Sequence, residues 1–362
     1  MLGVEVVNPG LLTTVQDLGR FGFQKYGVPT SGAMDQTALR AANLLVGNEE
    51  AAAGLESTGE GPSLRALSEL IVAVLGADME PRVDGRPIEN GTAALVRSGE
   101  LLELGRARQG LRAYLAIAGG IDVPVMLGSR STCLPAAFGG LIGRPLRRGD
   151  RLAIGRADGR PLGLKGRRLP PGWWNPVGEV VTLRVVLGSQ DDRFTADGIR
   201  TFLTAEYRLT PEMDRMGVRL QGPPIAHRSG ADIISDSIPL GAVQVPADGQ
   251  PIILLADRQT TGGYTKIAVV IREDTYRLAQ AAPGQIVRFR QISMAEAHAC
   301  LTAYEKRFQA LRQAWQSRAA WHHYTLCLGG RSFRVSLEED GGTYRVNLEE
   351  QTKRRAQEAD GG

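Results

Sequence analysis

Polar side chains are concentrated in one long, irregular segment near the N-terminus, from Leu11 to Asp35. Glycines interrupt this segment, and a predicted helix with Asn43 in it follows. Such a loop collects hydrogen-bond donors beside the positive end of a helix dipole, where an anion or a carbonyl oxygen can be bound. Loops of this length inside a compact domain are usually functional. The alternative is a polar surface loop in which Asp35 only caps the helix.

A second polar segment, residues 257–266, lies between two strongly apolar runs that predict buried strands. Polar groups at the ends of buried strands gather at the mouth of a barrel, where ligands bind. Arg258 and Lys266 could neutralise a phosphate or carboxylate, while Gln259 and Tyr264 could orient a planar amide. The alternative is a hairpin turn at Gly262 and Gly263 with an exposed salt bridge.

A third, smaller group is Asp214 and Arg215, which we place next to the site, although adjacent charges of this kind commonly pair on the surface. Across the three segments, the catalytic candidates are Arg20, Gln24, Asp35, Arg258 and Lys266. The substrate-binding candidates are Thr14, Gln16, Tyr26, Ser31, Gly32, Asn43, Asp214, Arg215, Gln259, Thr260 and Tyr264.

Several common kinds of site are not indicated by the sequence. It has no GxxxxGK[ST] motif, so we expect no P-loop for ATP, and no Met-Lys-Met around any of its five lysines, so we expect no biotin attachment. The four histidines and three cysteines lack the spacings of metal ligands, and we predict no metal site. Ser31 has no evident histidine partner, which argues against a hydrolytic triad.

Charge and hydropathy narrow the class of protein. The net charge of +4 comes from scattered basic residues interleaved with acidic ones, so nucleic-acid binding is not favoured. The longest apolar stretch, Leu70 to Ala77, is too short to span a bilayer, and Glu5 and Pro9 interrupt the N-terminal apolar residues. We therefore expect a cytoplasmic protein without a membrane association.

The positioning elements are predicted to be mainly strands. Forty-five glycines and 19 prolines among short apolar runs favour a β-rich α+β fold, and 362 residues favour two domains. The segment from Arg156 to Glu179 is rich in Gly, Pro and Arg, so we place a boundary near residue 175. The predicted parts are 1–175, 176–292, an amphipathic helix at 293–320 that opens on a Ser293–Glu296 capping box, a β extension at 321–350, and a disordered tail at 351–362.

Long motifs in this sequence resemble the KipA family, also described as allophanate hydrolase subunit 2-like. They are residues 9–35 (PGLLTTVQDLGRFGFQKYGVPTSGAMD), 43–48 (NLLVGN), 118–122 (AGGID), 128–131 (GSRS), 214–220 (DRMGVRL), 244–246 (QVP) and 257–266 (DRQTTGGYTK). The resemblance runs from about Val4 to Phe289. The family includes the C subunit of prokaryotic 5-oxoprolinase, the carboxyltransferase domain of urea carboxylase, and a sporulation regulator that antagonises a kinase inhibitor.

The resemblance implies two cyclophilin-like β-barrel domains, followed here by the helix and the small β extension. That extension is similar to the piece that precedes biotin carrier modules in carboxylases. The resemblance also implies a heteromeric complex with a partner of the KipI or oxoprolinase B-subunit type, a LamB/YcsF-type A subunit, and ATP in a site shared with a partner.

Three functions follow from the resemblance, and the polar residues alone do not separate them. We rank first an ATP-dependent 5-oxoprolinase or amidolyase that acts on a small cyclic or linear amide. A carboxyltransferase for urea or a related amide, with biotin supplied in trans, ranks second. A non-catalytic regulator that antagonises a kinase inhibitor ranks third.

Overall fold

The computed structural model describes residues 3–157, 161–174, 177–316, 321–328, 331–340 and 343–351. Its chain forms two compact units, Met1–Leu301 and Thr302–Gly362. The predicted disordered tail falls almost wholly on residues 352–362, which lie outside the described residues. Within the described part, no helix is both long enough and apolar enough to cross a membrane.

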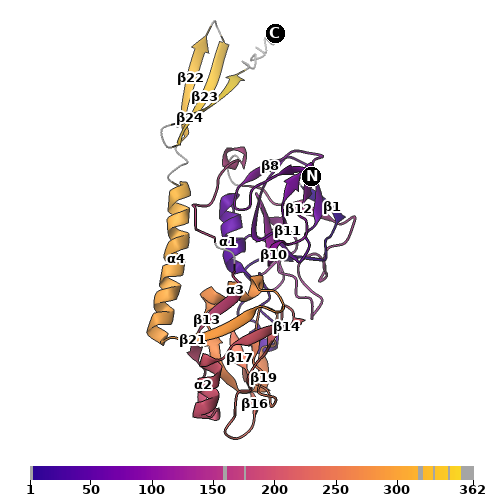
Figure 1. Ribbon diagram of the computed structural model, residues 1–362. Coiled ribbons are helices and arrows are strands. Elements are labelled where there is room, and N and C mark those ends of the chain that lie inside the picture. The colour runs from indigo at the N-terminus through magenta and orange to yellow at the C-terminus, as the bar shows by residue number, and fades with distance from the viewer. Residues whose placement is uncertain are drawn as a thin grey trace, which may run out of the picture. The chain divides into compact units, whose positions relative to one another are not determined.

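The first half of the larger unit consists of two antiparallel sheets on one shared apolar core (Figure 1). The larger sheet has the order β11-β12-β1-β4-β9-β6-β7, with β1 (Gly3–Asn8), β4 (Ser63–Ala66), β6 (Arg82–Val83), β7 (Arg86–Pro87), β9 (Leu101–Glu103), β11 (Ile121–Asp122) and β12 (Arg151–Ile154). The smaller has the order β2-β3-β10-β5-β8, with β2 (Leu12–Gln16), β3 (Gly54–Thr58), β5 (Leu70–Asp78), β8 (Ala94–Val96) and β10 (Gln109–Ile117). Helix α1 (Gln36–Leu45) contacts β5 and β10, and short turns η1 (Gln24–Tyr26) and η2 (Pro161–Leu164) complete this half.

The second half forms a closed barrel with the strand order β13-β20-β17-β18-β15-β14-β21. Its strands are β13 (Val180–Leu187), β14 (Tyr207–Met213), β15 (Gly217–Gln221), β17 (Ala242–Gln244), β18 (Ile252–Leu254), β20 (Lys266–Val270) and β21 (Ile286–Gln291). A parallel pairing of β13 with β21 closes it. Additional elements are η3 (Asp191–Arg193), α2 (Ala196–Thr204), η4 (Arg272–Asp274) and α3 (Thr275–Gln280). The β-rich class is thus confirmed, with the closed barrel in this half and two sheets in the other.

The alternative considered for residues 257–266, a hairpin turn at Gly262 and Gly263, does not occur. Strand β17 lies between β18 and β20 and pairs with both, so a tight turn cannot join those two strands. The connection instead contains β19 (Thr261–Tyr264), which pairs with β16 (Asp232–Ser237) as a separate two-stranded ribbon.

Helix α4 (Met294–Gln316) begins at the predicted capping box, which is confirmed. The Ser293 amide donates to Glu296 Oε2 at 2.8 Å, and the Glu296 amide donates to Ser293 Oγ at 3.2 Å. Beyond it, β22 (Trp321–Leu328), β23 (Arg331–Asp340) and β24 (Thr343–Gln351) form an antiparallel sheet. Residues directly opposite each other share a face, so the pairs Leu326–Phe333 and Val335–Leu348 give one apolar face.

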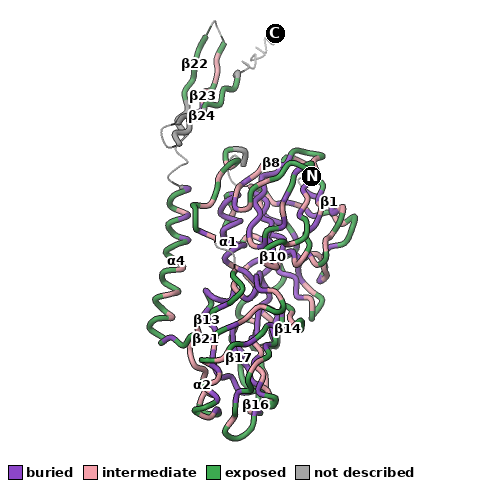
Figure 2. The backbone as a smooth tube through the Cα atoms, in the orientation of Figure 1, coloured by how far each residue is buried: buried purple, intermediate pink, exposed green. Residues whose placement is uncertain are grey.

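The barrel core supplies a test of the fold. Phe289 is buried, with its ring centroid 4.2 Å from that of Phe202 and 5.8 Å from that of Tyr207. Ile234 is 95% exposed, and its strand β16 is largely exposed (Figure 2). We expect Phe289→Ala to lower the free energy of unfolding by about 3–5 kcal/mol, because it leaves a cavity. Ile234→Ala should change it by less than about 0.5 kcal/mol. Urea denaturation measures both, and equal effects would contradict this barrel packing.

Candidate functional site

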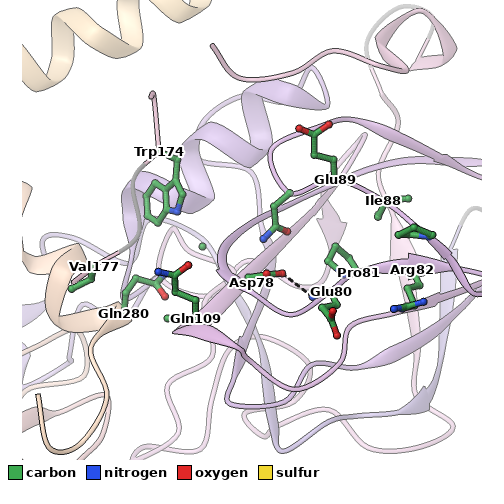
Figure 3. Close-up of a pocket in the computed structure, with 14 residues that line it drawn as sticks. Asp78, Glu80, Pro81, Arg82, Ile88, Glu89, Gln109, Trp174, Val177 and Gln280 are labelled. Carbon is green, nitrogen blue, oxygen red and sulfur yellow. Dashed lines mark hydrogen bonds between the residues drawn. The ribbon is translucent and has the colours of Figure 1, made fainter. Parts of the chain in front are cut away.

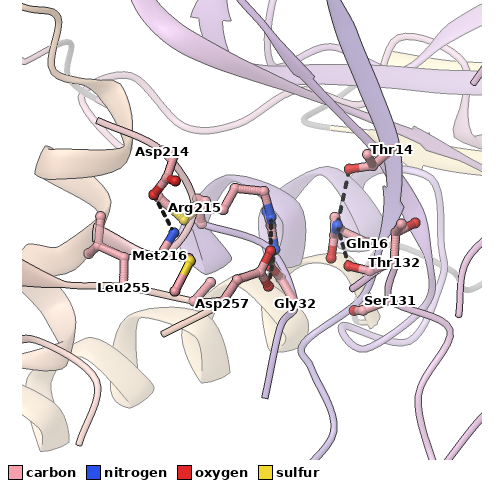
Figure 4. A network of polar contacts seen from close by, with 12 residues as sticks. Thr14, Gln16, Gly32, Ser131, Thr132, Asp214, Arg215, Met216, Leu255 and Asp257 are labelled. Carbon is pink, nitrogen blue, oxygen red and sulfur yellow. Dashed lines mark hydrogen bonds and ion pairs between the residues drawn. The ribbon is translucent and has the colours of Figure 1, made fainter. Parts of the chain in front are cut away.

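The N-terminal loop is fixed to the first half by buried polar contacts. Arg20 is buried; its Nη2 donates to the Ser131 carbonyl, and its guanidinium stacks 4.6 Å from the Phe138 ring centroid. Burial lowers the pKa of Arg20. Gln16 Nε2 donates to Thr14 Oγ1 at 3.0 Å and to the Thr132 carbonyl at 3.2 Å (Figure 4). These three predicted site residues position the loop.

Asp35 lies at the start of α1 and joins the two halves of the larger unit. Its Oδ1 accepts a hydrogen bond from the Ala38 amide at 2.9 Å and caps the helix, while Oδ2 accepts from Gln280 Nε2, on α3, at 2.8 Å. The side chain is fully buried, and burial raises its pKa to about 7, partly opposed by the Gln280 and Ala38 hydrogen bonds.

Arg215 is the centre of a buried ion network between the two halves, and the alternative of a surface pair with Asp214 does not occur. Its Nε and Nη2 donate to the two oxygens of Asp257 at 2.9 and 3.2 Å, and its Nη1 bonds Glu56 on β3. Nη2 also donates to the Gly32 carbonyl at 2.6 Å (Figure 4). Asp214 is exposed, and its carboxylate instead accepts from backbone amides in its own turn.

Glu56, Tyr114 and Gln280 belong to this junction, and local sequence patterns do not indicate them. Glu56 Oε2 accepts from the Met34 amide and from the Tyr114 hydroxyl, both at 2.8 Å, and the Tyr114 hydroxyl accepts from the Asp35 amide at 2.7 Å. The contact partners are 22 to 245 positions apart in sequence, so no local pattern identifies them. The one available signal is a charged Glu56 within a strand that is otherwise buried.

A cavity of about 210 Å³ opens beside this network. Its polar walls come from the first half at Gln24, Thr30, Ser31 and Gln36 and from the second half at Arg258, Arg272 and Thr275. In the part of the chain that the structure describes, no aspartate or glutamate lines this cavity. The two predicted polar segments therefore meet at one concave, cationic surface.

Arg258 is the most buried charge in the cavity wall, and its protein partners are all neutral. Nε donates to the Ile238 carbonyl at 3.0 Å, and Nη1 donates to Thr30 Oγ1 and to the Leu255 carbonyl, both at 3.2 Å. Burial lowers the pKa of Arg258 to about 10, so the guanidinium remains charged at neutral pH. A buried cation without a counter-ion is an arrangement that favours an anionic ligand.

The remaining predicted residues lie away from the cavity walls. Lys266 Nζ contacts Asp236 Oδ2 at 3.2 Å on the ribbon side of the barrel. Asn43 is buried and donates to backbone carbonyls of the loop after α1. Gln259, Tyr264 and Tyr26 are exposed and Thr260 is half-buried, and none of these four lines the cavity.

A second cavity, of about 430 Å³, is lined by Trp174, Val177 and Gln280 on one side and by Asp78, Glu80 and Glu89 on the other (Figure 3). Two of its acidic groups already have cationic partners, Glu80 with Arg108 at 2.9 Å and Glu89 with Arg168 at 3.2 Å. Because these charges are neutralised, this cavity gives weaker evidence of a ligand than the first.

The sequence and the fold of this chain are both similar to those of known carboxyltransferase-domain proteins. Residues 26–291 match the family model of the carboxyltransferase domain, subdomains A and B. The chain is 38% identical over 313 residues to the C subunit of 5-oxoprolinase from Escherichia coli (strain K12), a match that covers 86% of this chain and 98% of that protein. It is 37% identical over 294 residues to the C subunit of 5-oxoprolinase from Haemophilus influenzae, covering 81% and 93%. The crystal structure of K. lactis urea amidolyase matches with a TM-score of 0.81 and 28% identity, over 97% of this chain and 23% of that much longer one.

The ion network predicts that the charge of Arg215 makes a large contribution to the free energy of unfolding. Arg215→Met leaves the buried carboxylates of Glu56 and Asp257 without their counter-ion, and we expect the free energy of unfolding to fall by about 3–5 kcal/mol. The matched change Arg219→Met removes an exposed ion pair with Glu212 and should cost less than about 1 kcal/mol. Urea denaturation compares them, and a loss below about 1 kcal/mol for Arg215→Met would contradict the role of the network.

Asp35 predicts a specific pH dependence of stability. The Asp35 carboxyl has a pKa of about 7 in the folded protein, above its ordinary value of 3.8, so the folded state binds this proton more tightly than the unfolded state does. This proton binding therefore contributes fully to the free energy of unfolding below about pH 4, and its contribution is lost as pH rises through about 7. The difference between these values corresponds to at most about 4 kcal/mol. Asp35→Asn keeps a capping side chain but does not ionise. The unfolding free energy of the wild type relative to this variant should therefore decrease from pH 5 to pH 8, and parallel profiles would contradict it.

Proposed function

We propose that this chain, which belongs to the family of carboxyltransferase domains with subdomains A and B, is the C-type component of a heteromeric, ATP-dependent 5-oxoprolinase. Identity of 38% over 98% of the length of the E. coli protein supports this assignment. The substrate class is a small amide, and the complex includes a partner of the KipI or oxoprolinase B-subunit type and a LamB/YcsF-type A subunit.

The cavity between the two halves is the proposed substrate site, and its cationic, acid-free lining within the described chain is the observation that carries the proposal. In a 5-oxoprolinase, the amide oxygen takes the γ-phosphoryl group of ATP and ADP leaves. Water then adds to the activated carbonyl carbon, the ring C–N bond breaks with a proton going to the nitrogen, and phosphate is released. Such a step needs fixed donors around the amide and cations near the transferring group. Arg258, Arg272 and Ser31 supply groups of these kinds in one place.

ATP is proposed to bind in a site shared with a partner protein. The sequence contains no GxxxxGK[ST] motif, so a P-loop in this chain does not supply the phosphate contacts. Arg20, a catalytic candidate on its sequence, supports the cavity indirectly, because its backbone amide donates to the Thr30 carbonyl at 2.8 Å and holds the cavity loop.

A carboxyltransferase for urea or a related amide is the second candidate function. The match to the K. lactis urea amidolyase covers 97% of this chain and therefore includes most of the segment after α4. In this function, carboxybiotin on another protein would deliver its carboxyl group to the amide in the same cavity.

Reconstitution distinguishes these functions. We expect the chain to co-purify with the B-type partner from the same organism, and the complete complex to hydrolyse ATP at least tenfold faster with 5-oxoproline than without it. The comparison uses complexes prepared with and without this chain. A complex that forms but hydrolyses ATP equally with and without 5-oxoproline would contradict the proposal, and carboxylation of urea by added carboxybiotin protein would favour the second function.

A further inference from the structure

The cavity between the two halves contains charge that the protein itself does not balance. At the same junction, Arg215 contacts two carboxylates, and within the second half Arg184 on β13 pairs with Asp274 at 2.6 Å. Arg258, although only 8% exposed, has no carboxylate within ion-pair distance among the described residues. Its Nη2 group makes no hydrogen bond to described protein atoms, so its donors remain for a ligand.

Arg272 adds a second guanidinium to the same wall. Its Nη2 donates to Gln36 Oε1 at 2.7 Å, which is again a neutral acceptor. Arg272 is exposed and also interacts with the carboxylate of Glu273 beside it, so the buried Arg258 is the uncompensated cation of this wall. Together the two guanidinium groups give a local positive potential at this concave surface. A guanidinium presents donors in a fork that matches a carboxylate in charge and geometry.

Ser31 is an unpartnered polar group in the wall of this cavity. It is 3% exposed, and its Oγ has no hydrogen-bond partner among the residues that the structure describes. Its φ of +53° lies in the left-handed region, where a side chain costs about 1 kcal/mol relative to glycine. The conformation is held by its amide, which donates to the Ala256 carbonyl at 3.1 Å. Glycine adopts this left-handed backbone conformation at lower energy than serine does. The presence of a serine here therefore indicates a role for its hydroxyl group.

The size of the cavity limits the ligand. Its volume of about 210 Å³ is below the roughly 300–1,000 Å³ of sites for drug-sized molecules. A single small ring with one charged substituent is compatible with this space.

We propose that this cavity binds the carboxylate of a small amino-acid-derived lactam through Arg258 and Arg272, and that the Ser31 hydroxyl donates to the ring oxygen. The inference rests on the proposed function and adds to it the way in which the substrate is selected. The ring amide alone is not sufficient, because a neutral amide such as urea leaves the buried guanidinium of Arg258 without a counter-ion. Arg258 and Ser31 are therefore specificity-determining residues.

Calorimetric titration of the full chain tests this proposal with three ligands: 5-oxoproline, 2-pyrrolidone (the same ring without the carboxylate) and urea. We expect 5-oxoproline to bind about 10- to 100-fold more tightly than 2-pyrrolidone, in line with a hydrogen-bonded charge, and urea to bind more weakly still. Equal binding of 5-oxoproline and 2-pyrrolidone would overturn the proposal, as would no binding of 5-oxoproline at millimolar concentration.

Three variants separate recognition from folding. Arg258→Met should reduce the preference for 5-oxoproline over 2-pyrrolidone to about one, Arg258→Lys should retain part of it, and Arg219→Met, a matched loss of charge outside the cavity, should leave it unchanged. Ser31→Gly should weaken binding of both lactams severalfold without lowering thermal stability, since it relieves the left-handed backbone. Unchanged selectivity in Arg258→Met, or unchanged lactam affinity in Ser31→Gly, would contradict the role assigned to that residue.

The outcome is independent of the reconstitution experiment. A complex that turns over 5-oxoproline while the full chain shows no preference for the carboxylate would overturn this inference and leave the proposed function intact. If the full chain prefers the carboxylate but the complex does not turn over 5-oxoproline, the proposed function would be overturned and this inference would stand.

Discussion

The junction of the two halves depends on the buried guanidinium of Arg215. It binds Glu56 from the first half, Asp257 from the second, and the Gly32 carbonyl of the loop that lines the cavity. Removing two carboxylates from water is costly, and only a well-placed cation offsets that cost. This requirement fixes the loop near Gly32 against the segment near Asp257. The cavity exists because these two segments are held together.

The two arginines near this junction have different roles because their counter-ions differ. Arg215 is neutralised within the protein and is structural. Arg258 follows Asp257 directly, yet it contacts only neutral oxygens and lines the cavity. The structure therefore places an internally compensated charge beside an uncompensated one. The first maintains the geometry, and the second is available to a ligand.

Local patterns in the sequence predicted much of this arrangement. The density of polar groups around Ser31 and Arg258 indicated two functional segments, and the family resemblance and β-rich class are confirmed. Pairings over long separations were not predictable, because Glu56 is separated from Arg215 by 159 residues and Gln280 from Asp35 by 245. Proximity in sequence predicts that Lys266 lies with Arg258 in one site. The strand order separates the two, since β19 leaves the barrel between them to pair with β16.

A crystal structure of the full chain with bound 5-oxoproline would test the central claim, that the uncompensated guanidinium of Arg258 at the junction belongs to the binding site. We expect ligand density in the junction cavity, with a carboxylate oxygen within hydrogen-bond distance of Arg258. Density beside Lys266, or in the cavity next to Trp174, with the junction cavity empty, would contradict it.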